Sequence, residues 1–344
     1  MLLRRSTFAL LLAFCAGATG WASAPAKPTR PLRPEDTPAA PATPESATPA
    51  ETENVPEETL VPVSNWLEAQ VELSRRGFSC GSIDGVRGLQ TAAALRAYQR
   101  SVGLKENGEL DQLTSESLLL TAPPLTEHIF TSEELAKLQP LPTTWLGKSE
   151  LSALSHATAL ESAAERYHAN PNFLKKLNPT VNWDDLLPGA TIQVPAVGPA
   201  VFTGRAAQVQ VRLAAHELEV TDDTGRIIAH FPVSIARNVE KRPVGELHVT
   251  VVIPDPNYTF DPEVFTESAE AKELGRKLIV PPGPNNPVGR AWIGLDLPGY
   301  GIHGTPEPEK VGRTESHGCF RLANWDARTL VEIAWTGLPV IVEP

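Results

Sequence analysis

Ser316-His317-Gly318-Cys319-Phe320-Arg321-Leu322, together with the earlier segment Tyr300-Gly301-Ile302-His303-Gly304-Thr305, brings one thiol and two imidazoles into a short part of the chain. A cysteine attacks a carbonyl as its thiolate, and at an ordinary pKa of about 8.5 only a small share of a thiol is ionised at neutral pH. A histidine within hydrogen-bond reach can take the thiol proton, and its imidazolium then stabilises the thiolate and lowers the thiol pKa. Cys319 is therefore the candidate nucleophile.

The residue before this cysteine is Gly318, which lets the backbone turn without a Cβ clash. Successive N–H groups could then converge on the oxygen of an acyl intermediate, and those of His317, Gly318 and Cys319 are the expected donors of this oxyanion hole. Zinc binding by His303, His317 and Cys319 is disfavoured, because no fourth ligand lies near them in the sequence and no Cys-x-x-Cys pair is present. We expect no metal and no organic cofactor.

Three cysteines occur, and removal of an N-terminal leader would leave only Cys80 and Cys319. In an oxidising compartment two cysteines can form a disulfide, so a structural bridge between them is the alternative to a reactive thiol. The reactive surroundings of Cys319 favour the free thiol. Cys80 is then expected to be a small, partly buried residue.

From about Arg205 to the C-terminus the pattern of apolar residues is that of strands. Val209, Val211 and Leu213 alternate with polar residues, and a second apolar segment at 227–235 follows a turn. Further strands are predicted at 248–253, 277–280 and 340–342. Helices are predicted at 263–275 and after Asn324 or Asp326, either of which could cap a helix. Residues 205–344 are therefore predicted to form one mainly-β domain.

This region resembles the L,D-transpeptidase catalytic domain family in five segments that follow the family order. Besides the two segments quoted first, they are Arg242-Pro243-Val244-Gly245-Glu246, Pro282-Gly283-Pro284-Asn285-Asn286-Pro287 and Trp292-Ile293-Gly294-Leu295. Val244 departs from the threonine that is usual in the family, and it lies outside the reactive segments. The resemblance implies a β-sandwich-like fold with short helices, in which the residues between Ile253 and Pro282 could form a flap.

The resemblance also implies an acyl transfer on peptidoglycan. Cys319 would attack the carbonyl between the diamino acid and the terminal D-Ala of a tetrapeptide stem, release D-Ala, and pass the acyl group to an amine of a second stem or of a wall protein. His303 would be the general base and acid, and His317 and Gly318 would supply oxyanion-hole backbone. Contacts with substrate are expected from Arg321, Ser316, Gly304, Thr305 and Tyr300. Arg321 could instead pin its own loop.

Two other functions are possible. One uses the same catalytic residues, and the other uses none of them. An L,D-carboxypeptidase would resolve the thioester with water instead of an amine, and sequence does not distinguish the two acceptors. A non-catalytic wall-binding protein would keep the N-terminal modules and use no thiol, which the presence of both Cys319 and His303 disfavours.

Residues 63–122 are predicted to form three short helices. Trp66, Ala69 and Leu73 recur at helical spacing until Gly77, and the third helix starts near Asp111. The segment resembles the three-helix peptidoglycan-binding domain at Gly77-Phe78, Ile83-Asp84-Gly85, Gly88, Thr91, Ala94-Leu95 and Tyr98-Gln99. The resemblance implies wall binding, and a helical spacer that binds nothing is the alternative.

Residues 145–197 contain two helix starts and a short strand. Thr158 and Glu161 have the spacing of a capping box, Asn170-Pro171 opens a second helix, and Thr191–Pro195 has the pattern of a strand. This order resembles a degenerate lysin motif, a module that recognises amino-sugar chains. Its opening strand is hard to find, and Trp145-Leu146-Gly147 is a poor substitute. A module that binds no glycan is the alternative.

Residues 1–24 have the basic, apolar and small-residue regions of a signal peptide, ending in Ala22-Ser23-Ala24. Phe14 stands where a lipoprotein cleavage box needs a small residue, which disfavours a lipid anchor. Residues 25–62 are rich in proline and poor in large apolar residues, so they are predicted to be a disordered linker. We expect an exported protein of the periplasm or cell envelope.

The formal net charge of −11 argues against nucleic acid or a polybasic membrane patch as the partner. No segment after the leader reaches the roughly 18 apolar residues of a membrane span. The expected partners are therefore the stem peptides and glycan strands of peptidoglycan, with a wall-attached protein as a further acceptor.

Overall fold

The computed structural model describes residues 60–264, 269–313 and 318–344. These ranges belong to one compact unit, Glu58–Pro344. The predicted leader, nearly all of the predicted linker, and the predicted site residues Ser316 and His317 lie outside the described residues. Within the described ranges, no helix has both the length and the apolar character needed to cross a membrane.

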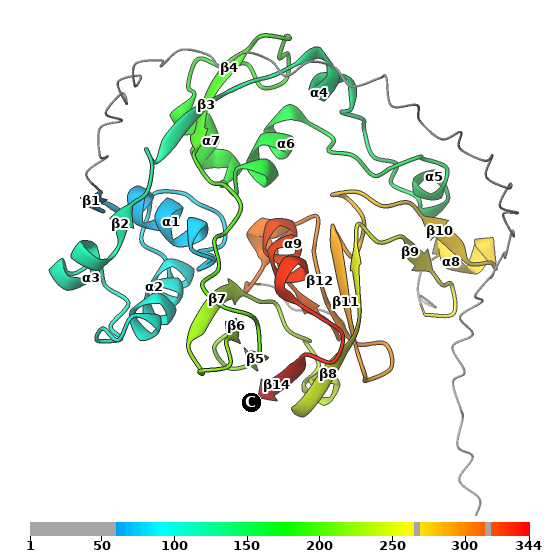
Figure 1. Ribbon diagram of the computed structural model, residues 1–344. Coiled ribbons are helices and arrows are strands. Elements are labelled where there is room, and N and C mark those ends of the chain that lie inside the picture. Colours follow the sequence, from blue (N-terminus) through cyan, green and yellow to red (C-terminus); the bar gives the residue numbers. More distant parts are fainter. Residues whose placement is uncertain (1–59, 265–268, 314–317) are drawn as a thin grey trace, which may run out of the picture. The chain divides into compact units, whose positions relative to one another are not determined.

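The first module is helical, as predicted (Figure 1). The strands β1 and β2 pair at its ends, and the fully buried Leu73, Leu95 and Leu118 contribute to its core. The side chain of Asn65 accepts a hydrogen bond from the Glu68 N–H, and Asp111 does the same for Thr114, which satisfies helix-end groups that would otherwise be free. This helical module consists of β1 (Val61–Pro62), α1 (Trp66–Arg75), α2 (Leu89–Ser101), α3 (Gln112–Ser117) and β2 (Leu119–Leu120).

Cys80 belongs to the core of the helical module and is not bridged to Cys319. Burial raises the pKa of the Cys80 thiol above its usual value, and the charges of Asp326 and Asp84 raise it further. The alternative of a structural disulfide between the two cysteines is therefore wrong, and Cys80 is an inert, buried thiol.

A second module has the element order strand, helix, helix, strand, and we call it the βααβ module. Its strands β3 (Leu125–Ile129) and β4 (Thr191–Pro195) are antiparallel, and α6 (Ala159–Arg166) and α7 (Pro171–Leu177) lie between them in the chain. Thr158 caps α6 and Asn170 caps α7, as predicted. Between β3 and α6 the chain also forms α4 (Ser132–Ala136) and α5 (Trp145–Ser149).

The structure corrects the start of this module. The expected boundary at residue 145 omits β3, which pairs with β4 along its whole length. Trp145-Leu146-Gly147 is no strand, because the Thr144 hydroxyl accepts a hydrogen bond from the Gly147 N–H (3.1 Å) and starts helix α5 there.

Residues 206–344 form a domain around an eight-stranded sheet, which we call the β domain. The strand order is β13-β12-β11-β8-β14-β5-β6-β7, and only the pairs β14–β5 and β12–β13 are parallel among its named strands. Helix α9 (Asn324–Ile333) packs its Ala327 and Leu330 into the core beneath the sheet. The strands are β5 (Gln208–Arg212), β6 (Glu217–Thr221), β7 (Ile227–Pro232), β8 (Gly245–Pro254), β11 (Ala291–Leu295), β12 (Gly301–His303), β13 (Phe320–Arg321) and β14 (Pro339–Glu343).

Two features of the β domain differ from expectation or extend it. The residues between β8 and β11 contain a hairpin of β9 (Tyr258–Phe260) and β10 (Leu278–Val280), with α8 (Ala269–Leu274) between its strands. Neither Asn324 nor Asp326 caps α9, because Ala323 is the cap residue and both polar side chains point to other parts of the chain. Asn324 donates to Glu165 Oε2 (2.8 Å), and Asp326 accepts from Ser79 Oγ (3.0 Å).

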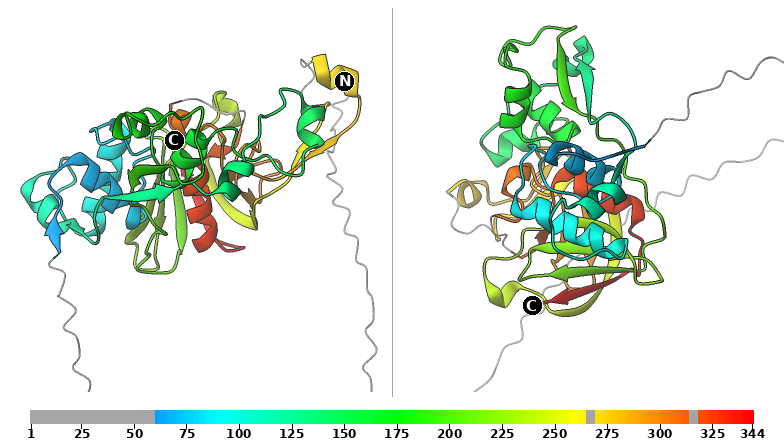
Figure 2. Two further views of the ribbon diagram at one scale, coloured as in Figure 1. Left: turned by 90° about the horizontal axis from the view of Figure 1, so that it is seen from above. Right: turned by 90° about the vertical axis from the view of Figure 1, so that its left-hand side faces the viewer.

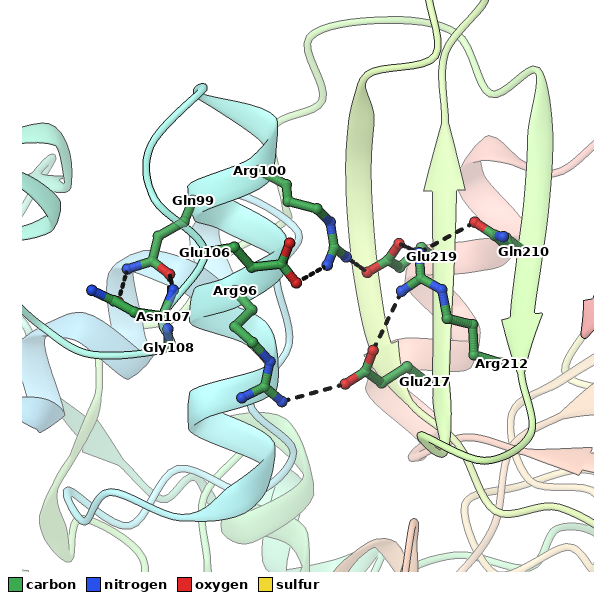
Figure 3. A network of polar contacts seen from close by, with 10 residues as sticks. All are labelled: Arg96, Gln99, Arg100, Glu106, Asn107, Gly108, Gln210, Arg212, Glu217 and Glu219. Carbon is green, nitrogen blue, oxygen red and sulfur yellow. Dashed lines mark hydrogen bonds and ion pairs between the residues drawn. The ribbon is translucent and has the colours of Figure 1, made fainter. Parts of the chain in front are cut away.

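Backbone hydrogen bonds join the helical module to the β domain. The Ser79 N–H donates to His230 O (2.8 Å) and the His230 N–H donates to Gly77 O (2.9 Å), so residues 77–79 extend the sheet beside its edge strand β7. Figure 3 shows ion pairs between α2 and this side of the sheet, where the buried Glu219 contacts both Arg100 and Arg212. Two guanidinium groups thus compensate one buried carboxylate.

Candidate active site

The register of two short parallel strands places the predicted nucleophile beside the predicted base. Ile302 of β12 is opposite Phe320 of β13, and His303 is opposite Arg321. Cys319 directly precedes β13 and is therefore level with Gly301. Side chains alternate between the two faces of a sheet, and adjacent strands lie about 4.8 Å apart. Because Ile302 and Phe320 point into the core, the side chains of Cys319, His303 and Arg321 share the other face.

One hydrogen bond determines which nitrogen of His303 is available. Its Nδ1 lies 2.6 Å from Gly304 O, and a carbonyl oxygen only accepts, so Nδ1 carries the proton and Nε2 has the free lone pair. Burial lowers the pKa of His303 to about 4, the Gly304 carbonyl opposes this shift, and the charge of Arg321 adds to it. The imidazole is therefore neutral at pH 7 and can accept a proton.

Cys319 is partly exposed, and its thiol donates to Gly299 O at 3.5 Å. Burial raises the pKa of this thiol, while a backbone hydrogen bond from Gly301 and the charge of Arg321 act in the opposite direction. The sequence predicted an imidazolium that lowers the thiol pKa. The structure indicates a neutral thiol beside a neutral imidazole, because desolvation disfavours the charged form of each group.

The other predicted site residues fall into two groups. The main chain of Arg321 pairs with Ser234 (2.9 Å in both directions), so the backbone holds its loop and the guanidinium lies on the face of Cys319. The Tyr300 ring lies 3.9 Å from the position that a Cβ on Gly318 would take.

Gly304 and Thr305 are buried, and the Thr305 hydroxyl accepts a hydrogen bond from the Glu307 N–H (3.3 Å). These two residues support the fold around His303.

Across the described ranges, no group of three or more His, Cys, Asp or Glu side chains is arranged to hold a metal ion.

Three further residues, Trp292, Gly301 and Tyr258, have no role that was predicted from the sequence. Trp292 is opposite His303 in the β11–β12 register, and their rings stack with centroids 5.8 Å apart. A Cβ on Gly301 would lie 2.8 Å from the Trp292 ring, so only glycine leaves room there. For Tyr258 of β9, burial mainly raises the pKa of the phenol, and the charge of Cys319 adds to this. Trp292 and Gly301 lie within segments that matched the family, which was the signal available for them.

Comparisons with known proteins identify the families of the β domain and of the helical module. Residues 206–342 match the family described as "L,D-transpeptidase catalytic domain", and residues 63–118 match "Putative peptidoglycan binding domain". A Bacillus subtilis protein named "Putative L,D-transpeptidase YqjB" is 31% identical over 139 residues, which cover 39% of this chain and 69% of that protein. The Bacillus licheniformis protein "Putative L,D-transpeptidase YkuD" is 26% identical over 186 residues, covering 54% and 93%.

The catalytic part thus defines an enzyme of peptidoglycan cross-linking. The chain belongs to the L,D-transpeptidase family. Its second matching region makes peptidoglycan the partner of the N-terminal part as well.

Proposed function

We propose that Cys319 is the nucleophile and His303 the general base of an L,D-transpeptidase that cuts the bond between the diamino acid and the terminal D-Ala of a tetrapeptide stem. One observation carries this proposal. The β12–β13 register puts both side chains on one face, and the Gly304 carbonyl leaves Nε2 of His303 free to take the thiol proton.

The reaction has two acyl-transfer steps. As the sulfur of Cys319 bonds to the carbonyl carbon, the thiol proton passes to Nε2 of His303, so thiol and imidazole are neutral until attack begins. The C–N bond then breaks, D-Ala leaves with the proton from the imidazolium, and a thioester remains. An amine of a second stem next attacks the thioester carbon while His303 takes its proton. The C–S bond then breaks, and the imidazolium returns the proton to the sulfur of Cys319. A wall-attached protein could supply the same amine.

Charge and backbone groups near Cys319 support the two charged stages of this mechanism. The guanidinium of Arg321 affects the pKa of both Cys319 and His303 and lies on their face, which suits a contact with a stem carboxylate. The N–H groups of Gly318 and Cys319 would bind the oxyanion, and His317 and Ser316, which lie outside the described residues, would complete this loop. Tyr300 would line the substrate site beside Gly318.

The remaining parts are proposed to hold the enzyme at the wall. Residues 1–24 would direct export and be removed, and residues 25–62 would be a linker in the periplasm or cell envelope. The strand–helix–helix–strand order of the βααβ module supports the lysin-motif interpretation and glycan binding. With residues 63–122 as the peptidoglycan-binding domain and 205–344 as a β-sandwich-like catalytic domain, the lysin-motif-like domain would extend from β3 to residue 197.

Incubation of the purified protein with disaccharide-tetrapeptide, followed by mass spectrometry, tests this proposal. A cross-linked dimer that has lost one D-Ala is expected, and Cys319→Ala should abolish it while leaving sedimentation with isolated peptidoglycan unchanged. Cys80→Ala is the matched control, because that thiol is buried away from the site, and it should keep the activity.

Two outcomes would contradict the proposal. Tripeptide as the sole product would replace it with an L,D-carboxypeptidase. Absence of any product that depends on Cys319 would leave a wall-binding protein.

A further inference from the structure

His303, the candidate base, lies on the face of the sheet that helix α9 does not cover. Helix α9, red in Figure 1 and Figure 2, packs against the core face of β8, β11 and β12. Ile302 points into this core, so the next side chain, that of His303, points to the opposite face. His303 is nevertheless only 6% exposed. Side chains on that opposite face therefore shield the imidazole from water.

Trp292 supplies one side of this cover. It is directly opposite His303 in the antiparallel pairing of β11 with β12. The indole and imidazole rings stack, with centroids 5.8 Å apart and an interplanar angle of 23°. Stacked aromatic pairs stabilise a structure beyond the effect of the area they bury, and they prefer particular relative orientations. The ring of the candidate base thus has a second contact that fixes its orientation, besides its hydrogen bond to Gly304 O.

Two glycines leave the space that the indole occupies. A Cβ on Gly301 would lie 2.8 Å from both Cζ2 and Cη2 of Trp292, and a Cβ on Gly294 would lie 3.1 Å from its Nε1. The two glycines are opposite each other in the β11–β12 register. Neither has a positive φ, so the backbone conformation does not require glycine at either position. Contact with the indole is the requirement that both glycines share.

The indole also extends to the level of the candidate nucleophile. Gly301, against which its six-membered ring lies, is level with Cys319, because Ile302 is opposite Phe320 in the β12–β13 pairing. Adjacent strands lie about 4.8 Å apart. Neighbouring strands therefore present the indole, the imidazole and the thiol on one face, in that order.

We propose that Trp292 is a positioning residue that holds the imidazole of His303 in the orientation in which it takes the thiol proton of Cys319. The inference rests on the proposed function of Cys319 and His303. The indole restricts rotation of the imidazole and keeps water from one of its faces. The ring of His303 is therefore neutral and in a single orientation when the reaction begins.

The titration of His303 tests this contact without any need for turnover. Within the described ranges, the charge of Arg321 on β13 acts on His303, and Cys319 is a titratable side chain on the same face, whereas Trp292 on β11 and Ile253 on β8 do not titrate. Burial is the main cause that lowers the pKa of His303 to about 4. Because Trp292→Ala exposes one face of the ring, the pKa should rise by about one pH unit or more, towards 6.5.

Nitrogen-15 NMR of histidine-labelled protein, titrated from about pH 8 down to about pH 5, measures this shift. The signal of His303 is identified by its loss in His303→Gln. In the wild type the ring should remain neutral over most of this range, and in Trp292→Ala it should titrate within it.

Steady-state kinetics with tetrapeptide substrate separates positioning of the base from binding of the substrate. Trp292→Ala should lower kcat about two- to tenfold, the range that corresponds to one aromatic pair, and leave KM within about twofold. The pH below which kcat/KM falls should rise by the same amount as the pKa of His303, because only the neutral imidazole can take the thiol proton. Trp292→Phe retains a stacking ring and should restore most of both values.

Ile253→Ala is the matched control. Ile253 is the neighbour of Trp292 on its other side, opposite it in the β8–β11 register, and its side chain is 39% exposed. The substitution removes apolar surface from the same face and leaves the stacked rings in place, so it should change neither the titration of His303 nor kcat. If Trp292→Ala does not fold, Trp292→Leu keeps apolar volume but has no ring to stack, and both effects should have the same direction.

An unchanged titration of His303 in a folded Trp292→Ala protein would overturn the proposal. So would effects of the same size in Ile253→Ala, or a fall in kcat without any shift of the pH profile, which would indicate that the indole only supports the fold. Absence of turnover in the wild type would instead contradict the proposed function, and the NMR titration would still decide the role of Trp292.

Discussion

His230 and His303 are two buried histidines of one sheet, and they share nearly every electrostatic property. Burial lowers the pKa of each to about 4. In each, Nδ1 lies close to a backbone carbonyl, Ser79 O at 3.2 Å for His230 and Gly304 O at 2.6 Å for His303. Both rings are therefore neutral at pH 7, and both would satisfy a search for titratable groups with a shifted pKa.

The two histidines differ in what lies next to the second nitrogen. His230 is on β7, where the helical module covers it, and its Nε2 has no hydrogen-bond partner within the described part of the chain. His303 is on β12 opposite Arg321, which lies two residues after Cys319, so the side chains of His303 and Cys319 share one face of the sheet. A lowered pKa thus indicates burial, and only the neighbouring thiol distinguishes His303 as the candidate base.

Separate substitution of the two histidines gives the largest expected difference in kcat. His303→Ala should lower kcat by about a thousandfold, within the range that a general base contributes. His230→Phe should keep kcat within about twofold of the wild type. Steady-state kinetics with tetrapeptide substrate measures both, and a large loss of kcat in a folded His230→Phe protein would remove the distinction drawn here.

The stability of the protein at acid pH should depend on His230. Its pKa is about 4 when folded, against 6.5 for an exposed histidine, so between these pH values the unfolded chain binds more protons. The contribution of the neutral His230 ring to the free energy of unfolding is fully present above pH 6.5 and is lost as the pH falls towards 4. Between these limits the wild type should lose up to about 3 kcal/mol more than His230→Phe. Urea unfolding at several pH values checks this, and parallel curves would contradict it.

Asp326 should show the opposite dependence at the same junction. Its carboxyl accepts a hydrogen bond from Ser79, and burial raises its pKa to about 8 in spite of that bond. The folded state then binds more protons than the unfolded state between pH 3.8 and 8, so stability falls as the pH rises through this window. Asp326→Asn should stabilise the protein by about 5 kcal/mol at pH 8 and little at pH 4. Thermal unfolding at both pH values measures it, and an equal effect at both would refute the assigned cause.

The sequence predicted those elements whose side chains have a clear period. The alternation at Val209 and Val211 predicted β5, and helical spacing around Leu73 predicted α1. By contrast, β3 was not predicted, because three of its five residues are exposed and no apolar alternation marks it. Helix α9 was predicted and its cap was not, since Asn324 and Asp326 serve distant partners.

The candidate site was predicted in its residues and not in its arrangement. Cys319 and His303 stand in segments that match a family, so their identity could be read from the chain. Their common face depends on the pairing of two very short strands, which leaves no periodic signal. The protonation of the pair depends on burial by residues far away in sequence, and the stacking of Trp292 on His303 depends on the register of two strands.

The backbone bonds from Gly77 and Ser79 to His230 also limit how this enzyme can evolve or be engineered. A chain that lost the helical module would expose the edge of β7, and an open apolar edge is a template for pairing with a second copy. Such a descendant would need charges or a new covering segment on β7 to prevent this pairing. The modules of this protein therefore cannot be exchanged freely, and a recombinant catalytic fragment would tend to self-associate instead of representing the enzyme.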